Sequence, residues 1–198
     1  MKESLLTILR DRNTTQRAFR SAADKLAEIL AVEMSRELIL ESTTVETPLS
    51  AAPGFKVKEP VVLISILRSG VALLPAFLRL YNDAKVGFLG IKRDEVTAKA
   101  FQYYENIPPL TKNETIFILE PMIASGGTAL LTLKKLAHYK VNFSKVFFVG
   151  FIASSEGINS IKEEFPEVQV RVVGEDKQLN AHKYIVPGLG DFGDRYFG

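Results

Sequence analysis

A strand-like run that ends at an acidic residue and continues into a loop of small residues constrains the fold of this chain most. Residues 116–119 (Ile-Phe-Ile-Leu) have the apolar composition of a buried strand, and Glu120 follows them directly. Residues 121–128 are mostly small, and residues 129–136 then repeat apolar side chains at helical spacing. A strand, a loop and a helix in this order present unpaired backbone N–H groups at the positive end of a helix dipole. The segment therefore predicts a phosphate-binding loop, with a carboxylate that can reach hydroxyl groups or a metal beside the phosphate.

Apolar runs alternate with helical patterns along the rest of the chain. Strands are expected at 61–67, 85–91, 145–152 and 168–173, and helices at about 14–33, 71–78 and 156–165. The run at 61–67 is apolar at nearly every position, as expected for a strand buried on both faces. Strands that alternate with helices indicate an α/β fold with a Rossmann-like parallel sheet flanked by helices. A length of 198 residues suits one domain, 1–198, with a full core.

Three segments show no regular spacing of apolar residues. Residues 41–60 predict a loop or a short hairpin, and two interpretations stay open: an arm that packs on a partner subunit, or an ordinary surface excursion. Residues 92–110 are polar and aromatic, and a segment of this length in a compact domain usually forms a functional flap or a hairpin. The tail, residues 180–198, is rich in glycine and is expected to be loop-like.

The composition excludes several kinds of function. The chain has no cysteine, so disulfides, zinc sites built on cysteine and thiol catalysis are excluded. A formal net charge of +2 gives no indication of nucleic-acid binding. Because no apolar stretch reaches the length of a membrane-spanning helix and the N-terminus lacks a long apolar run, we expect no membrane partner and a cytoplasmic location. Neither histidine lies in a carboxylate cluster at metal-binding spacing. His182 lies just before the tail motif at 184–195, and two interpretations stay open: a residue that lines a site, or, as the favoured one, a residue of local structure.

Polar loops follow three of the expected strands. They are Arg68-Ser69-Gly70, the segment that begins at Lys92-Arg93, and residues 120–128. Each of them alone would be explained as an ordinary turn. Because ligands of parallel sheets bind beyond the carboxyl ends of the strands, two arginines, a phosphate loop and an acid at one edge indicate a phosphorylated, polyanionic ligand. The loop lacks the Gly-Lys-Ser/Thr ending of a P-loop and the Gly-x-Gly-x-x-Gly pattern, which disfavours nucleoside triphosphatases and dinucleotide-dependent oxidoreductases.

Longer motifs give the chain a specific resemblance. Residues 118–128 resemble the phosphoribosyl-pyrophosphate (PRPP) motif of type I phosphoribosyltransferases, in the acid-Pro-Met form of the uracil phosphoribosyltransferase family. Residues 184–195 (Tyr-Ile-Val-Pro-Gly-Leu-Gly-Asp-Phe-Gly-Asp-Arg) are similar to the uracil-binding loop of that family, a much rarer signature. Residues 66–70 resemble its pyrophosphate loop, and residues 93–95 with 103–104 resemble its flexible hood. The resemblance covers nearly the whole chain and implies the type I phosphoribosyltransferase fold with a hood or hairpin.

The resemblance also implies a role for each matching residue. PRPP would bind at Arg68, Arg93, Glu120, Pro121, Met122, Ile123, Ala124, Ser125, Gly126, Gly127, Thr128 and Asp191, and uracil at Tyr184, Ile185, Gly190, Asp191 and Phe192. The catalytic set would be Arg68, Arg93 and Asp191, with both arginines on the pyrophosphate. Uracil would be read largely by backbone groups, and cytosine would leave one buried pair mismatched. The chain departs from the common pattern at Glu120, where the family more often has Asp, and at Ser125, where it more often has Thr.

The reaction implied by the resemblance is phosphoribosyl transfer in pyrimidine salvage. Uracil and PRPP would give UMP and diphosphate, by displacement at ribose C1′ through an oxocarbenium-like transition state. The protein would supply no metal site of its own, because Mg²⁺ would arrive with PRPP. The family resemblance also implies a homodimer or homotetramer, and GTP activates some relatives.

Two alternatives share the phosphate loop. Another phosphoribosyltransferase, for a purine or for orotate, should lack the 184–195 loop, and a base-competition assay distinguishes it. A non-catalytic regulator that senses pyrimidine nucleotides on the same fold would need a basic surface for RNA or DNA. Tight, salt-dependent RNA binding would favour that second alternative.

Overall fold

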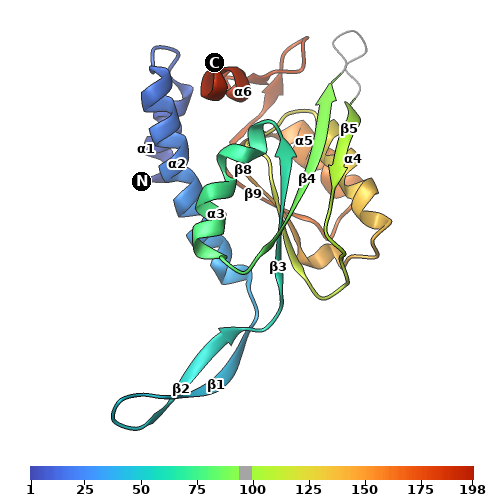
Figure 1. The fold of residues 1–198 in the computed structure, drawn as a ribbon. Helices are drawn as coiled ribbons and strands as arrows, with labels where there is room; N and C mark the ends of the chain where they lie inside the picture. The colour runs from blue at the N-terminus through green and yellow to red at the C-terminus, as the bar shows by residue number, and fades with distance from the viewer. Residues whose placement is uncertain (94–99) are drawn as a thin grey trace.

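A mostly parallel sheet forms the centre of the protein (Figure 1). The computed structural model describes residues 1–93 and 100–198. The strands of this sheet are β3 (Val61–Leu67), β4 (Lys85–Arg93), β5 (Ala100–Asn106), β6 (Thr115–Leu119), β7 (Met122–Ile123), β8 (Val146–Ser154) and β9 (Gln169–Asp176). Their order is β5-β4-β3-β6-β8, with β7 and β9 also paired to β8. Among the described strand pairs of this sheet, only β4–β5 is antiparallel. The predicted α/β fold is confirmed, with one antiparallel strand at the edge.

Helices cover both faces of the sheet. One face carries α1 (Lys2–Arg10), α2 (Gln16–Met34), α3 (Leu74–Leu80) and α6 (Phe192–Phe197), and the other carries α4 (Gly127–Ala137) and α5 (Ser155–Glu164) (Figure 1). Neighbouring residues of β3 therefore enter different cores. Leu63 packs in the core shared with α1, α2 and α3, and Ile64 packs in the core shared with α4 and α5. This double burial is the reason for the continuous apolar run at 61–66.

The remaining elements are short. Single 3₁₀ turns occur at Ser35–Glu37, Ser69–Ala72 and Phe143–Lys145, and β10 (Gln178–Leu179) pairs with β11 (Ile185–Val186) in the tail. The predicted helix at 14–33 is observed as α2, which begins after Thr15, whose hydroxyl accepts a hydrogen bond from the Ala18 N–H at 3.3 Å. In the described part of the chain, no helix is long and apolar enough to cross a membrane.

Hairpins form in two of the segments that show no regular spacing of apolar residues, 41–60 and 92–110. Residues 40–57 form β1 (Leu40–Glu46) and β2 (Ala51–Val57), which stand away from the body of the protein (Figure 1). The hairpin interpretation of residues 41–60 is therefore confirmed. Strands β4 and β5 form the described part of the hood, whereas Asp94 and Glu95, which were predicted to belong to it, lie outside the described residues.

Candidate active site

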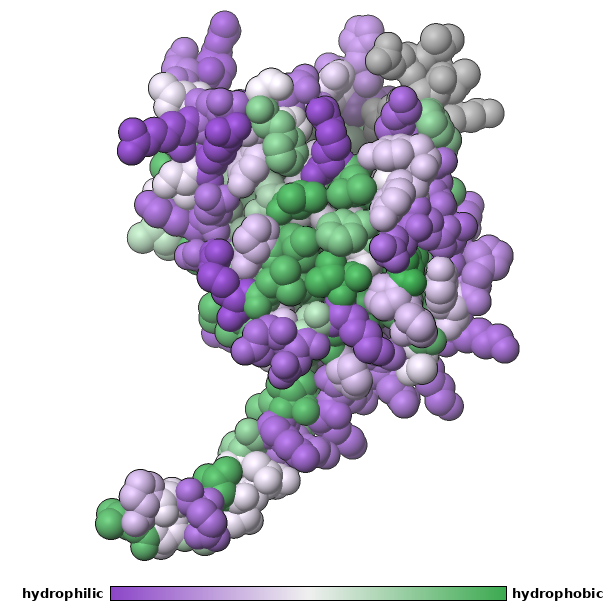
Figure 2. All heavy atoms as spheres, viewed as in Figure 1, coloured by the Kyte–Doolittle hydropathy of each residue, from purple (hydrophilic) through white to green (hydrophobic). Residues whose placement is uncertain are grey.

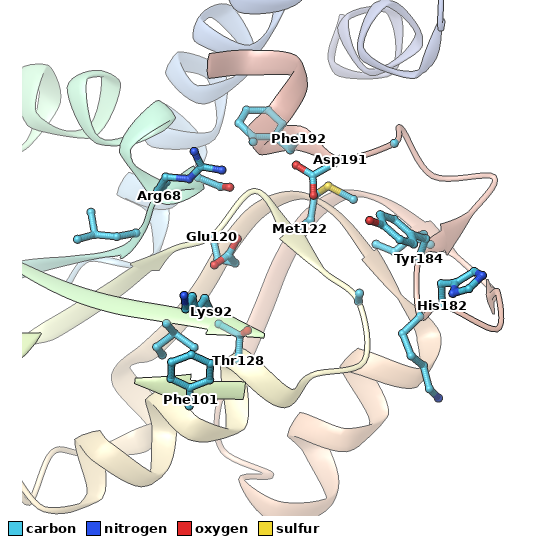
Figure 3. Close-up of a pocket in the computed structure, with 18 of the residues that line it drawn as sticks. Arg68, Lys92, Phe101, Glu120, Met122, Thr128, His182, Tyr184, Asp191 and Phe192 are labelled. Atoms are coloured by element: carbon cyan, nitrogen blue, oxygen red, sulfur yellow. The ribbon is translucent and has the colours of Figure 1, made fainter. Parts of the chain in front are cut away.

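A cleft of about 1200 Å³ opens at the carboxyl ends of the central strands (Figure 3). Its walls come from the turn after β3, from β4 and β5, from the loop after β6, and from the C-terminal tail. Parallel sheets bind ligands at this edge, so the segments that were predicted to converge do meet in one place. The lining residues with polar, charged or aromatic side chains are Arg68, Ser69, Lys92, Phe101, Tyr103, Glu120, Thr128, His182, Lys183, Tyr184, Asp191 and Phe192.

The loop that follows β6 is fixed to β8 by main-chain hydrogen bonds. The N–H of Glu120 donates to the Val149 carbonyl at 3.1 Å, and the Pro121 carbonyl accepts from the Phe151 N–H at 2.8 Å. Gly150 allows this approach, because a Cβ at that position would lie 2.3 Å from the carbonyl oxygen of Glu120. The main chain therefore leaves the sheet in one defined direction, with the Glu120 side chain in the cleft (Figure 3).

The start of α5 holds the middle of the same loop. The Ser154 hydroxyl donates to the Ala124 carbonyl at 2.5 Å and accepts from the Gly157 N–H at 2.9 Å. Gly126 then precedes α4 with φ of +82°, in the left-handed region that favours glycine. These contacts fix the N-terminus of α4 beside the cleft, where Thr128 lines the wall. The local geometry is that of an anion site, with free N–H groups at the positive end of a helix.

The residues of the predicted PRPP loop, 120–128, fall into three groups. Pro121 and Ile123 are buried in the protein, so they can offer a ligand only main-chain groups. Residues 125–127 form the turn into α4. The loop residues that line the cleft are Glu120, Met122, Ala124 and Thr128.

Arg68 lies in the turn that follows β3, and its side chain is on the same side of the cleft as Asp191 (Figure 3). The Leu67–Arg68 peptide bond is cis. The tail packs against this turn, since a Cβ at Gly193 would lie 3.3 Å from the Ser69 hydroxyl and 3.9 Å from a guanidinium nitrogen of Arg68. Arg93 ends β4, and the predicted contact of its side chain with diphosphate remains a prediction.

Two carboxyl groups, Glu120 and Asp191, project into the cleft (Figure 3). Burial raises the pKa of Glu120 to about 8; the Asp191 carboxylate contributes to the rise, and a hydrogen bond from the Met122 N–H opposes it. Asp191 is exposed, and it accepts a hydrogen bond from the Asp194 N–H at 2.9 Å as the N-cap of α6. Near neutral pH the raised pKa therefore favours the protonated form of Glu120, beside the Asp191 side chain that its N-cap contact orients.

The tail reaches the cleft through a tight turn. The Asn180 side-chain oxygen accepts from the N–H groups of His182 at 2.9 Å and of Tyr184 at 3.0 Å. Tyr184 is half exposed and lines the cleft, as predicted. His182 also lines the cleft, which was the less favoured of its two interpretations.

Phe192 is held in the core next to the cleft. Its side chain is 2% exposed and packs on Phe19 and Phe151, with ring centroids 5.4 and 5.5 Å away. The ring therefore cannot swing out to cover a base. The neighbouring Gly190 and Asp191 line the same wall, and the predicted reading of uracil by their main-chain groups stays a prediction.

Several lining residues were not assigned to the site from the sequence. Lys92 adjoins Arg93 at a strand end, which is a usable signal, and its ammonium group lies 5.4 Å from the Phe101 ring centroid. Phe101 could not be assigned from the sequence, because the hood residues show no regular hydrophobic pattern that separates cleft-facing from solvent-facing side chains. The others without an assigned site role are Leu67, Ser69, Ile91, Tyr103, Ala181, His182, Lys183 and Gly193.

The fold is shared with other phosphoribosyltransferases. The purine phosphoribosyltransferase from Pyrococcus horikoshii matches with a TM-score of 0.51 over 79% of this chain and 84% of its own, at 12% sequence identity, so the likeness concerns the fold. A parallel sheet with a phosphate loop after an acidic strand end, an arginine turn and a hood hairpin defines a type I phosphoribosyltransferase.

Sequence comparison assigns the family within this class. Residues 1–198 match the uracil phosphoribosyltransferase family along their whole length. The uracil phosphoribosyltransferase of Mycoplasma genitalium is 37% identical over 193 residues, which cover 98% of this chain and 93% of the relative. The solved structure of the AQ2163 protein from Aquifex aeolicus matches with a TM-score of 0.90 and 36% identity, over 99% of this chain and 93% of that one. The chain belongs to the uracil phosphoribosyltransferase family.

Proposed function

We propose that this protein transfers the phosphoribosyl group of PRPP to uracil, which gives UMP and diphosphate. The observation that carries the proposal is the meeting of three segments in one cleft: the loop at 120–128, the Arg68 turn and the tail at 184–193. Relatives named uracil phosphoribosyltransferase, similar over nearly the full length of the chain, support the choice of base.

PRPP binds along the phosphate loop and the arginine turn in this proposal. The 5′-phosphate lies on the main-chain N–H groups of residues 125–128, where the dipole of α4 attracts it. Glu120 faces the ribose hydroxyls, donating a hydrogen bond while protonated and accepting when ionised. The diphosphate contacts Arg68 and Arg93, since guanidinium groups match its planar pairs of oxygens.

Uracil binds against the tail. Its polar edge alternates acceptors and donors, which main-chain groups of Ile185 and of 190–192 can satisfy. The Tyr184 ring lines the same wall. Cytosine would place a donor where uracil places an acceptor and leave a buried pair unsatisfied, at a cost of about 1–3 kcal/mol per group.

The reaction forms the bond between N1 of uracil and C1′ of the ribose, with inversion at C1′. The bond between C1′ and the diphosphate oxygen breaks, its electron pair leaves with the diphosphate, and the departing diphosphate takes up the proton from N1. Positive charge grows on the ribose as the diphosphate departs. The Asp191 carboxylate stabilises the cationic sugar, and Arg68 and Arg93 stabilise the leaving group. The rest of the rate acceleration comes from the positioning of both reactants and from the exclusion of water by the hood.

The residues of the cleft fit a magnesium ion that arrives with PRPP. Mg²⁺ usually keeps several waters and is held by one or two carboxylates together with substrate phosphates. The cleft offers the carboxyl groups of Glu120 and Asp191, and the described residues contain no cluster of three or more His, Cys, Asp or Glu that could hold a metal by itself. On the diphosphate, the ion would supply positive charge that favours departure of the leaving group.

The proposal is tested with purified protein, PRPP, Mg²⁺ and radiolabelled uracil. UMP is the expected product, and an excess of cytosine, hypoxanthine or orotate should not compete. Nucleotide formed from hypoxanthine or orotate in place of uracil would make the protein a transferase for another base. A folded protein that forms no nucleotide and binds RNA in a salt-dependent way would instead favour the regulator.

A homodimer or larger assembly is part of the proposal, with the β1–β2 hairpin as a contact. The hairpin stands clear of the body (Figures 1 and 2) and exposes two large apolar side chains, Leu49 (96%) in its turn and Phe55 (71%) on β2. A two-stranded hairpin alone is at most marginally stable in water. Figure 2 also shows apolar surface on the face where α3 and β4 lie. A second copy of the chain would cover these side chains.

Replacing Phe55 by serine is expected to shift the protein toward a smaller oligomer. Burial of a phenylalanine side chain stabilises a contact by roughly 1.5–3 kcal/mol. In a two-fold symmetric contact the substitution occurs in both subunits, so its effect on the free energy of association is doubled. Light scattering coupled to size-exclusion chromatography measures the mass over a dilution series. Ile8→Ser, at a residue of α1 that is 38% exposed, is the control and should leave the mass unchanged. An identical mass for Phe55→Ser at all concentrations would exclude the hairpin as a stabilising contact.

GTP activation and a cytoplasmic location also belong to the proposal. The first rests on the family resemblance, and the second on the apolar pattern of the sequence. Initial rates at sub-saturating PRPP, with and without GTP, test the first. Cell fractionation tests the second.

A further inference from the structure

The C-terminal loop, residues 185–191, is anchored in the core by Ile185 and Leu189, but it contains two glycines in the left-handed region. Gly188 and Gly190 have φ of +60° and +82°, and glycine enters and leaves this region at small cost. The loop nevertheless carries Gly190 and Asp191 into the wall of the cleft. Contacts from outside the loop must therefore hold its main chain in place.

Arg10, the last residue of α1, makes the first of these contacts. Its guanidinium pairs with both carboxylate oxygens of Asp176, at 2.7 and 2.8 Å, and donates to the Gly188 carbonyl at 2.9 Å. The Gly188 N–H donates to the same carboxylate at 2.8 Å. Both main-chain groups of Gly188 are thus held by one ion pair between α1 and the end of β9.

The Arg10–Asp176 pair is sheltered and ionised. Asp176 is 8% exposed, and the side chain of Arg10 is 27% exposed. Burial of the Asp176 carboxyl acts to raise its pKa, but hydrogen bonds from Arg10 and Gly188 outweigh it and hold the pKa below the usual value. Bidentate contact of this kind is more directional than an ordinary surface ion pair.

Arg195, in α6, makes the reciprocal contact. Its guanidinium donates to the Leu189 carbonyl at 2.7 Å, to the Asp11 carbonyl at 2.6 Å, and to the Leu9 carbonyl. It also lies over the Phe19 ring, 4.4 Å from the centroid. One arginine therefore reaches from α1 to the loop, and the other reaches from the end of the chain back to α1.

We propose that Arg10 and Arg195 are positioning residues for base binding. They hold the main chain at 188–189, so that Gly190 and Asp191, which follow directly, present fixed groups to the base. The inference rests on the proposed function, since it takes uracil as the ligand of this loop. Helix α1 is anchored separately by its buried leucines, so removal of the Arg10 charge leaves it packed; these leucines are Leu5, Leu6 and Leu9.

Kinetics of the Arg10→Gln variant test the proposal. The KM for uracil is expected to rise about 10–100-fold, as loss of charge-assisted hydrogen bonds implies, while the KM for PRPP changes less than about threefold. Arg10→Lys keeps the charge without the planar fork and should recover part of the loss. Arg79→Gln is the matched control, because Arg79 forms an exposed ion pair with Glu28 at 2.6 Å and does not line the cleft.

Hydrogen exchange in the ligand-free protein gives a readout that does not depend on activity. Amides of residues 185–191 should exchange faster in Arg10→Gln than in the wild type or in Arg79→Gln. A wild type that forms UMP, with an Arg10→Gln variant whose KM for uracil is unchanged, would overturn the inference. Equal rises in both KM values would also overturn it, since they indicate general loss of structure. If the wild type forms no UMP, the proposed function fails, and unchanged exchange in the loop would then overturn the inference independently.

Discussion

The Arg68→Ala variant is expected to lose on the order of 10²–10³-fold in kcat/KM for UMP formation while it remains folded. Arg68 lies in the wall of the cleft, where it would face the departing diphosphate. Because negative charge on that group grows as the C1′–O bond breaks, the loss should affect kcat as well as the KM for PRPP. Steady-state kinetics with both substrates varied measure the two effects separately.

Two further variants serve as controls for the Arg68→Ala result. Arg68→Lys retains a positive charge but not the planar fork, and should recover part of the lost rate. Arg79→Ala removes an exposed arginine from the end of α3 and should leave the kinetics unchanged. Wild-type kinetics in Arg68→Ala would remove Arg68 from the diphosphate site. A loss of activity that came with a lower melting temperature would instead point to damage of the turn.

The stability of the ligand-free protein is expected to contain a component from Glu120 that falls as pH rises. The pKa of this carboxyl group is raised from 4.5 to about 8, chiefly by burial. The folded protein therefore binds the proton more tightly than the unfolded chain does. The corresponding stabilisation is complete below about pH 4.5 and is lost as pH rises through about 8. We expect a loss on the order of 2–3 kcal/mol, since the cleft admits water and the full effect is screened.

The Glu120→Gln variant isolates this component. Its side chain has nearly the same size and stays neutral, so the free energy of unfolding of the variant relative to the wild type should increase between about pH 5 and pH 9. Urea denaturation at several pH values measures that difference. Glu164→Gln, at an exposed position paired with Lys134, should show no comparable increase. A difference that is constant with pH would contradict the raised pKa of Glu120.

Local sequence patterns were sufficient to predict most strands of the sheet and to locate the main motifs of the candidate site. A parallel strand is apolar on both faces, so residues 61–66 identify β3 without reference to its neighbours. Arg68 and Glu120 follow strand ends, which is where ligands of such sheets bind. Helix α1 was not predicted, because it has only nine residues and packs through three leucines. The edge strand β5 was foreseen only as a hood or hairpin, since its residues have no regular period.

The contacts that support the candidate site could not be predicted, because they join residues far apart in the sequence. Ser154 supports the Ala124 carbonyl across 30 residues, and Arg10 meets Asp176 across 166. Hydroxyl and guanidinium groups have many candidate partners in a sequence of this length. Only packing of α1 against β9 and of α5 against the loop selects one of them.

The sequence by itself determined the α/β class and the family, and it predicted the phosphate loop, because periodicity and short motifs are properties of neighbouring residues. The tertiary structure decided the state of Glu120 and the support of the C-terminal loop. The pKa of Glu120 depends on its removal from water and on the nearby Asp191 carboxylate, which is 71 positions further along the chain. The loop depends on ion pairs and hydrogen bonds that join both ends of the protein. Burial and distance arise only when the chain is packed, and no local pattern records them.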